Sequence, residues 1–216
     1  MTGPHPLLGL FLAAAEGRFP PVDGEVTVTP PLPGGLECSV AFTGHAVVAT
    51  ALPAPKILAA GPDGFGASLA PDFLRLLAGP RGTVGVTDAT LTAPGTGGPP
   101  RLGRLDGYDD HPRVRHARRI RRNVTVYGDE RGLITLAEGL AGRPELSIEL
   151  HAPEAPVPAS ARGRGRSLLA DALTLVPPGS PVFAAVAPGN ARSLRGFLAA
   201  GFVPIGSEAI VEPGRV

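Results

Sequence analysis

The sequence predicts an α/β fold in which a mixed sheet is flanked by helices. Segments with the alternation or β-branched content of strands are interleaved with segments of helical periodicity. The second half of the chain reads as helix, three strands, helix, strand, helix, strand, which is typical of this class. With 216 residues, 43% of them hydrophobic, the chain is long enough to bury a sizeable core.

The first half of the chain is predicted to be rich in strands. Strand patterns cover residues 25–29, 37–52 and 82–92. Residues 71–78 are expected to form a short helix, because a proline begins the segment and Gly79 follows it. A Pro- and Gly-rich stretch at residues 93–100 is the best candidate for a boundary. We therefore expect a strand-rich region over residues 1–105 and a second domain over residues 106–216.

The second half shows a clearer pattern. A basic amphipathic helix is expected over residues 111–122, and strands over residues 123–127 and 133–138. Residues 145–150 alternate, which places the apolar and the polar side chains on opposite faces of a strand. Further elements are predicted as helices over residues 167–175 and 190–200 and as strands over residues 182–186 and 202–211. Asn190 is expected to cap the second of these helices, with Gly201 beyond its end.

An anion site is predicted at residues 162–167, Arg-Gly-Arg-Gly-Arg-Ser. Glycine lets the backbone approach an anion closely, and the free N–H groups of a first helical turn point toward it. Three arginines add positive charge at the same place. The segment therefore predicts that a phosphorylated molecule binds here.

Together with a later segment, this site resembles the GNAT superfamily of acyl-CoA-dependent N-acetyltransferases. Residues 162–167 are similar to the family's pyrophosphate loop, Gln/Arg-x-x-Gly-x-Gly/Ala, with Ser167 at its last position. Asn190-x-x-Ser193, followed by Gly201-Phe202 and Gly206, is similar to its helix-to-strand segment. The resemblance covers residues 111–211. The first half would then supply the family's first strand and early helices, or form a diverged second GNAT-like unit.

The resemblance implies transfer of an acetyl group from acetyl-CoA to an amine by direct attack in a ternary complex, with no metal. Coenzyme A would lie where two parallel strands, over residues 145–150 and 182–186, separate. The residues implied to hold it are Ile148, Glu149, Leu150, Arg162, Gly163, Arg164, Gly165, Arg166, Ser167, Asn190 and Ser193.

A general base is needed to remove a proton from the amine. Glu149 is the first candidate, because its strand would hold the acyl arm, and Glu145 shares its face. Glu138 and His151 are further candidates. The alternative for each carboxylate is a solvated position on a half-exposed strand.

One residue departs from the family pattern. Many members carry a tyrosine that protonates the leaving thiolate, and the corresponding position here is Phe197, which cannot donate a proton. The alternative function is therefore a non-catalytic GNAT-like protein that binds acyl-CoA or serves in interactions.

Other classes of function fit the sequence less well. A net charge of +1 and the absence of tryptophan argue against nucleic-acid binding, and we interpret the six arginines between Arg113 and Arg122 as a solvated helix face. The cluster of Asp106, Asp109, Asp110 and His111 matches no metal-binding spacing.

The single cysteine indicates in which cellular compartment the protein is expected. Cys38 allows no intrachain disulfide, fits a reducing cytoplasmic environment, and is interpreted as a small buried hydrophobe in a strand. No apolar stretch reaches membrane-spanning length. We expect a monomer or homodimer that acts on a small-molecule or peptide amine, with no nucleic-acid or membrane partner.

Overall fold

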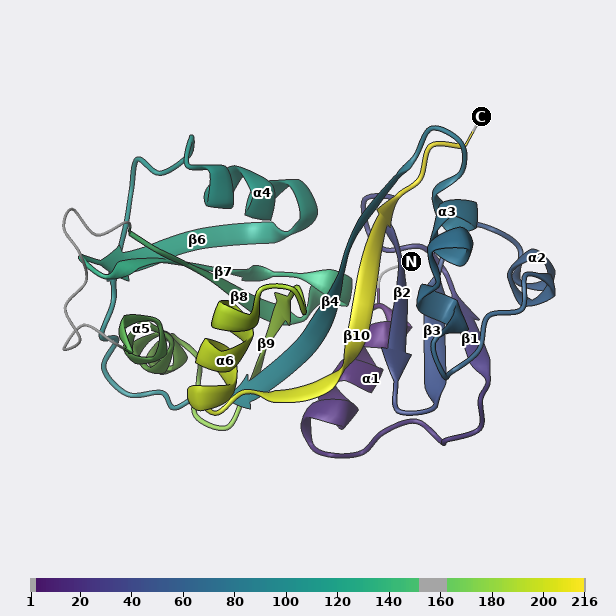
Figure 1. The fold of residues 1–216 in the computed structure, drawn as a ribbon. Helices are drawn as coiled ribbons and strands as arrows, with labels where there is room; N and C mark the ends of the chain where they lie inside the picture. The colour runs from purple at the N-terminus through teal and green to yellow at the C-terminus, as the bar shows by residue number, and fades with distance from the viewer. Residues whose placement is uncertain (1–2, 152–162, 216) are drawn as a thin grey trace. The chain divides into compact units, whose positions relative to one another are not determined.

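The computed structural model describes residues 3–151 and 163–215. Its strands are hydrogen-bonded in the order β1-β3-β2-β10-β4-β9-β8-β7-β6-β5, and helices flank the sheet (Figure 1). Pairs β1/β3 and β8/β9 are parallel, whereas β2/β3, β6/β7 and β7/β8 are antiparallel. The predicted fold class, a mixed sheet flanked by helices, is confirmed.

The elements of the described chain follow in sequence order. They are α1 (Pro6–Ala15), β1 (Val26–Thr29), β2 (Glu37–Phe42), β3 (His45–Ala49), α2 (Ala54–Ala59), η1 (Ala67–Leu69), α3 (Pro71–Ala78), β4 (Thr83–Pro94), β5 (Gly103–Arg104), α4 (Pro112–Ile120), β6 (Arg122–Asp129), β7 (Gly132–Glu138), η2 (Leu140–Gly142), β8 (Pro144–Leu150), α5 (Arg164–Ala172), η4 (Leu173–Leu175), β9 (Pro181–Val186), α6 (Ala191–Ala199) and β10 (Val203–Glu212).

Two compact units make up the chain. The first comprises Met1–Thr90, Ala185–Pro188 and Pro204–Val216, and the second comprises Leu91–Ala184 and Gly189–Val203. The units are interleaved in sequence, because β4, β9 and β10 each have residues in both. The linear division at residue 105 stays a prediction about domains.

The core of the first unit forms on both faces of the β2–β3 hairpin, whose two strands are buried at every position. On one face, Val48 packs with Ile57 of α2 and Leu77 of α3. On the other, the ring of Phe11 in α1 lies 5.8 Å from that of Phe42. Helix α3 has the bounds that the sequence predicted, whereas α1, α2 and β5 were not predicted as such.

The second unit has helices on both faces of its strands. Val114 of α4 packs against Val126 and Leu133 on one face. Strand register places Glu145, Ser147 and Glu149 on that same face, since Glu149 lies opposite Leu133. Leu150, which points to the other face, lies against α5, where a Cβ added at Gly165 would be 3.6 Å from Leu150 Cδ1. Helix α4 therefore covers the face that carries the glutamates.

Helix α5 begins earlier than the sequence predicted. The predicted start was Ser167, but the helix starts at Arg164, and Gly163 before it has a φ of +95°. The first helical hydrogen bond runs from Ser167 N–H to Gly163 O at 2.9 Å. Arginine is a good helix former and glycine tolerates positive φ, so the Arg-Gly segment continues the helix rather than forming a loop.

None of the helices among the described residues combines the length and apolar character that a membrane span requires.

Candidate active site

Strands β8 and β9 are joined at one position only. They run parallel, and the one pair in register is Glu145 with Phe183. Along its other edge, β8 pairs with β7 over its whole length, from Pro144 to Leu150. The separation of these two strands, which the family resemblance implied, is therefore present. Beyond Glu145, the β9-facing edge of β8 has no strand partner within the described residues.

The hydrogen bonds of β8 identify which of its backbone groups face this open edge. His151 N–H donates to Arg131 O at 3.1 Å, so the backbone groups of His151 point toward β7 and its turn. Successive residues of a strand point their N–H and C=O groups to opposite sides. Glu149 therefore points its backbone to β7, whereas Ile148 and Leu150 direct theirs to the open edge. Of the three backbone positions predicted to hold an acyl arm, these two are available.

The first turn of α5 lies next to the end of β8. The Arg164 guanidinium donates to Glu130 O at 3.2 Å and to Arg131 O at 3.0 Å, in the turn between β6 and β7. Within the described residues, the backbone N–H groups of Arg164, Gly165 and Arg166 have no acceptor, as expected for a helix start. The N–H of Ser167 does not join them, because it is used inside the helix.

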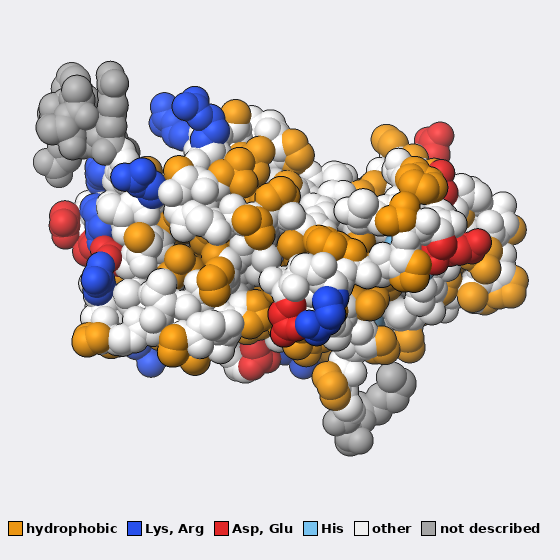
Figure 2. Space-filling model, turned by 90° about the horizontal axis from the view of Figure 1, so that it is seen from below, with side chains coloured by type: hydrophobic (Ala, Val, Ile, Leu, Met, Phe, Trp, Pro, Cys, Tyr) orange, Lys and Arg blue, Asp and Glu red, His pale blue; other side chains and the backbone are white. Residues whose placement is uncertain are grey.

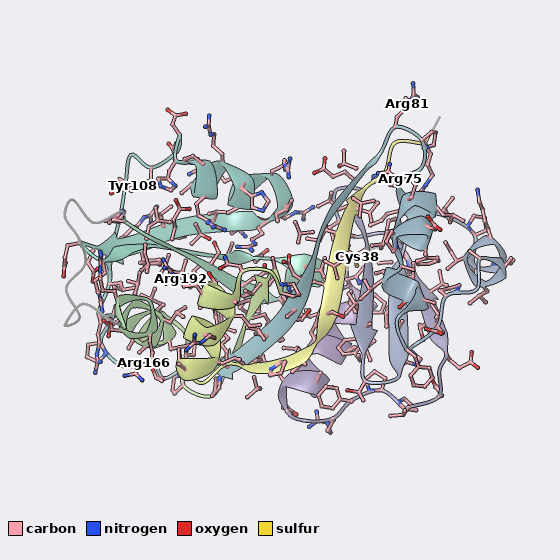
Figure 3. All side chains as sticks on the ribbon, in the orientation of Figure 1. Cys38, Arg75, Arg81, Tyr108, Arg166 and Arg192 are labelled. Atoms are coloured by element: carbon pink, nitrogen blue, oxygen red, sulfur yellow. The ribbon has the colours of Figure 1, made fainter. Side chains whose placement is uncertain are left out.

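The arginines of this segment differ in what they can do. Arg162 lies outside the described residues. The Arg164 side chain holds the neighbouring turn, whereas Arg166 is exposed and labelled on α5 in Figure 3. Basic side chains gather, with some acidic ones between them, at the end of the second unit where α5 begins (Figure 2). Of the two described arginines of this segment, only Arg164 contacts the neighbouring turn.

Glu149 stands at the edge of a small polar group under the start of α4. Its Oε2 accepts from Arg113 Nε at 3.1 Å, and its Oε1 lies 3.9 Å from His111 Nε2. The Glu149 side chain remains 41% exposed. His111 caps α4 by accepting from Arg113 N–H at 3.2 Å through Nδ1. The Tyr108 ring lies near that of His111, with centroids 6.1 Å apart and the ring planes tilted by 44°.

Glu145 lies on the same face but in a different environment. It is 3% exposed, and its Oε1 is 2.5 Å from Arg121 NH2 while its Oε2 is 2.9 Å from Arg143 NH2. Burial opposes its ionisation, but the two guanidinium groups outweigh burial and hold the pKa of Glu145 below its ordinary value. A sealed, doubly paired carboxylate cannot reach a substrate amine. The structure therefore gives no support to Glu145 as a general base.

The other base candidates also differ in accessibility. Glu138 is exposed at the end of β7, where its Oε1 accepts from Asn123 Nδ2 at 2.8 Å. His151 follows β8 and is half-buried. Neither lies in the stretch of β8 beyond the join with β9, so Glu149 is the candidate that the geometry favours.

Three residues singled out in the sequence lie in or next to α6. Asn190 caps α6 as predicted, with its Oδ1 accepting from Ser193 N–H at 3.1 Å. That contact uses the N–H of Ser193. Phe197, at the position of the family's tyrosine, is 3% exposed and packs edge-on against Phe202 with ring centroids 4.9 Å apart. Phe197 is thus a core residue.

Sequence reasoning missed the partners that α4 provides. Arg113 and Arg121 were interpreted as part of a solvated face, yet both pair with glutamates of β8. Arg113 lies in the first turn of α4, whereas Arg121 follows the last helical residue with extended backbone, so no helical spacing links the two. Their partners are more than 20 residues away in sequence, so the pairing itself depends on the tertiary fold.

Among the described residues, no group of three or more His, Cys, Asp or Glu side chains is arranged so that it could hold a metal ion.

Comparison with known proteins finds solved structures that resemble this chain only weakly. No family model and no curated protein matches the sequence. Five chains of solved structures match, among them a crystal structure from Novosphingobium aromaticivorans that is assigned to the GNAT family of acetyltransferases. It is 15% identical, with a TM-score of 0.40, over 62% of this chain and 66% of that one. At a TM-score this low, conclusions about function rest on the geometry of the chain's own residues.

Proposed function

We propose that the chain is an acyl-CoA-dependent N-acyltransferase, with acetyl-CoA as donor and a small-molecule or peptide amine as acceptor. The observation that carries the proposal is the open edge of β8, where Ile148 and Leu150 present backbone groups that have no partner within the described residues, close to the first turn of α5. Coenzyme A combines an extended chain containing two amides with a pyrophosphate. Its parts match these two features in order along the strand.

The strand edge and the helix start would bind different parts of the donor. An amide-bearing chain can add to an open strand edge through backbone hydrogen bonds. The N–H groups of Arg164, Gly165 and Arg166 lie at the positive end of a helix dipole, which favours a phosphate. Gly165 has no side chain to block that approach, and among the described residues a Cβ there would meet only Leu150 Cδ1 within 4 Å.

Glu149 would serve as the general base. Its carboxylate takes a proton from the acceptor amine, whose nitrogen then forms a bond to the thioester carbonyl carbon while the carbon–sulfur bond breaks and the thiolate leaves. Arg113 orients the carboxylate through the 3.1 Å contact. The exposure of Glu149 leaves it accessible to an acceptor.

The alternative is a non-catalytic acyl-CoA-binding protein. Phe197 favours it, because this side chain is locked in an aromatic pair and carries no proton to donate to a thiolate. Thiol release from acetyl-CoA in the presence of an amine panel separates the two functions. Binding without release would identify the binding protein.

The binding step can be tested by thermal denaturation with acetyl-CoA and with free coenzyme A. Binding at a ligand concentration of about 100 times Kd stabilises a protein by about 2.7 kcal/mol, so we expect a clear rise in Tm. Gly165→Glu should abolish the rise, because it places a carboxylate among the N–H groups, whereas Gly165→Ala should retain most of it.

Gly9→Glu is the matched control, since Gly9 is an exposed helical glycine of α1 with nothing within 4 Å of its Cβ position. Gly9→Glu should leave the ligand-induced shift unchanged. A wild-type Tm that responds to neither ligand, or a Gly165→Glu variant that responds as the wild type does, would contradict the proposal.

A further inference from the structure

A second group of reactive side chains lies in the first unit and has no part in the proposed acyl transfer. Asp23 Oδ1 lies 2.8 Å from His45 Nδ1, and His45 Nε2 lies 3.0 Å from Thr27 Oγ1. A carboxylate, an imidazole and a hydroxyl are thus linked in series. Hydroxyl nucleophiles are activated by this arrangement on many unrelated folds.

The hydrogen bonds determine which way each proton points. Asp23 is a carboxylate whose pKa is lowered, first by the hydrogen bond from His45 and then by the N–H of Glu25, which donates to Oδ1 at 2.9 Å. The carboxylate favours the tautomer with its proton on His45 Nδ1, and in that neutral imidazole Nε2 carries the lone pair. Thr27 then donates its hydroxyl proton to Nε2, which is the polarisation that a nucleophilic hydroxyl needs.

The backbone holds these three residues in place. Thr27 lies in β1 and His45 begins β3, and these strands pair in parallel. Asp23 precedes a turn in which Gly24 N–H donates to Gly44 O at 2.9 Å and Gly64 N–H donates to Gly24 O at 3.0 Å. The group is therefore built on a strand pair and a hydrogen-bonded turn, and not on free side chains.

Thr27 is exposed, whereas its base is sheltered, with the His45 side chain 10% exposed. A base shielded from water keeps its hydrogen bonds, while the nucleophile can still meet a substrate. A reactive site needs an exposed nucleophile next to a buried base. Hydrogen bonds that only stabilise the fold do not need this arrangement.

A donor for a developing oxyanion lies next to Thr27. Ala46 N–H donates to Glu25 O and Thr50 N–H donates to Thr29 O, so residues 25, 27 and 29 point their backbone groups toward β3. By alternation, the N–H of Val28 points to the open side of β1, which is the terminal strand of the order. It has no acceptor within the described residues and is adjacent to the nucleophile in sequence.

Apolar side chains stand exposed beside the group. Val22 and Phe65 are 67% and 71% exposed. Val22 packs over Gly44, and the ring of Phe65 lies over Gly24, where a Cβ would be 3.0 Å from its Cε2. Covering a side chain of this size contributes about 1.5–3 kcal/mol. These two residues are therefore suited to contact an apolar acyl chain.

We propose that Thr27 is a nucleophile that hydrolyses carboxylic esters with a short apolar acyl chain, with His45 as its base and Asp23 orienting the base. Thr27 Oγ1 bonds to the ester carbonyl carbon as its proton passes to His45 Nε2. The ester carbon–oxygen bond breaks, and the alcohol leaves with that proton. Water then bonds to the carbonyl carbon of the acyl-threonine and gives a proton to Nε2. The bond between that carbon and Oγ1 breaks, Oγ1 takes the proton back from Nε2, and the carboxylic acid leaves.

The test is hydrolysis of p-nitrophenyl butyrate by the full chain. Thr27→Val keeps the shape of the side chain and removes the hydroxyl, and we expect it to lower the rate about 100-fold or more, the usual scale for losing assisted proton transfer. His45→Gln should lower the rate to a similar extent. Thr27→Ser, which keeps a hydroxyl, should retain activity.

Thr83→Val is the matched control, because Thr83 is also an exposed strand threonine of the first unit and has no histidine contact in the described structure. It should hydrolyse the ester at the wild-type rate. Mass spectrometry of the quenched reaction should find the butyryl group on Thr27, in the tryptic peptide of residues 19–56. Equal rates for Thr27→Val and the wild type, or a butyryl group on a different residue, would overturn the proposal.

Discussion

The Arg143 guanidinium lies 5.4 Å from the centroid of the Phe183 ring, at the position where β8 and β9 are still paired. Arg143 is fully buried and also binds Glu145, the β8 partner of Phe183, through Nε at 3.1 Å. Cation–π contacts of desolvated guanidinium groups contribute about 2 kcal/mol. The Arg143–Phe183 contact therefore links the two strands where they pair, and they separate just beyond it.

Replacing the carboxylate of this cluster should destabilise the protein strongly. Glu145→Gln removes the negative charge that pairs with both buried guanidinium groups, those of Arg121 and Arg143, and we expect the free energy of unfolding to fall by about 3–5 kcal/mol. Urea denaturation followed by circular dichroism measures the loss. Glu138→Gln, at an exposed position of the same unit, should change stability by less than about 0.5 kcal/mol. Equal midpoints for the two variants would show that the cluster contributes nothing.

The same carboxylate should contribute to the pH dependence of stability. Burial raises the pKa of Glu145, but the two arginines lower it by more, so its folded pKa is below the ordinary 4.5. The unfolded chain therefore binds the proton at a higher pH than the folded chain does. The stabilisation is fully present above 4.5 and is lost as pH falls through the folded pKa.

The stability difference between wild type and Glu145→Gln should accordingly narrow below about pH 4.5. Urea midpoints measured from pH 7 down to the acid limit of folding test this. A difference that stays constant over that range would mean that Glu145 has an unperturbed pKa.

Loss of the Glu149 carboxylate should affect the rate of acyl transfer more than donor binding. Glu149→Gln removes the proton acceptor, and we expect kcat to fall about 100-fold, within the usual range for general-base catalysis. The KM for acetyl-CoA should change little, because the backbone of Ile148 and Leu150 would hold the donor. Thiol release is the assay, and Glu138→Gln is the control. An unchanged kcat would remove Glu149 from the mechanism.

Introducing a tyrosine at position 197 should not supply a proton donor to the thioester. Phe197 is 3% exposed and packs edge-on against Phe202. A hydroxyl placed in this core without a partner costs about 1–3 kcal/mol. We expect Phe197→Tyr to lower Tm and to leave thiol release no faster than the wild type. A rate increase would show that this side chain reaches the reacting thioester.

Replacing Gly64 should destabilise the first unit, because the backbone of Gly44 and His45 passes close to its Cα. A Cβ at Gly64 would lie 2.4 Å from Gly44 O and 2.6 Å from His45 N, and both are backbone atoms. Gly64→Ala should cost about 1–3 kcal/mol through the forced shift. Gly9→Ala, in the open helical site of α1, should instead stabilise by about 0.5–1 kcal/mol. Differential scanning calorimetry distinguishes the two signs, and a neutral Gly64→Ala would contradict the close approach.

The sequence predicted the positions of most strands and helices because their signals are local. Alternation identified β8 and assigned Glu145, Ser147 and Glu149 to one face, and the proline start and glycine end of α3 gave its bounds. The start of α5 was wrong by three residues. A Gly-Arg segment can continue a helix or form a loop, and only the bond from Ser167 N–H to Gly163 O decides between them.

By itself, then, the sequence determined the fold class, the face on which each β8 side chain lies and the cap at Asn190, because each depends on backbone periodicity or on bonds within one turn. Only the tertiary structure decided that Glu145 is sealed between arginines while Glu149 stays accessible. Only the tertiary structure shows that the side chains of Asp23, His45 and Thr27 are linked by hydrogen bonds. The physical reason is that burial and ion pairing depend on neighbours distant in the chain, and periodicity carries no information about which neighbours those are.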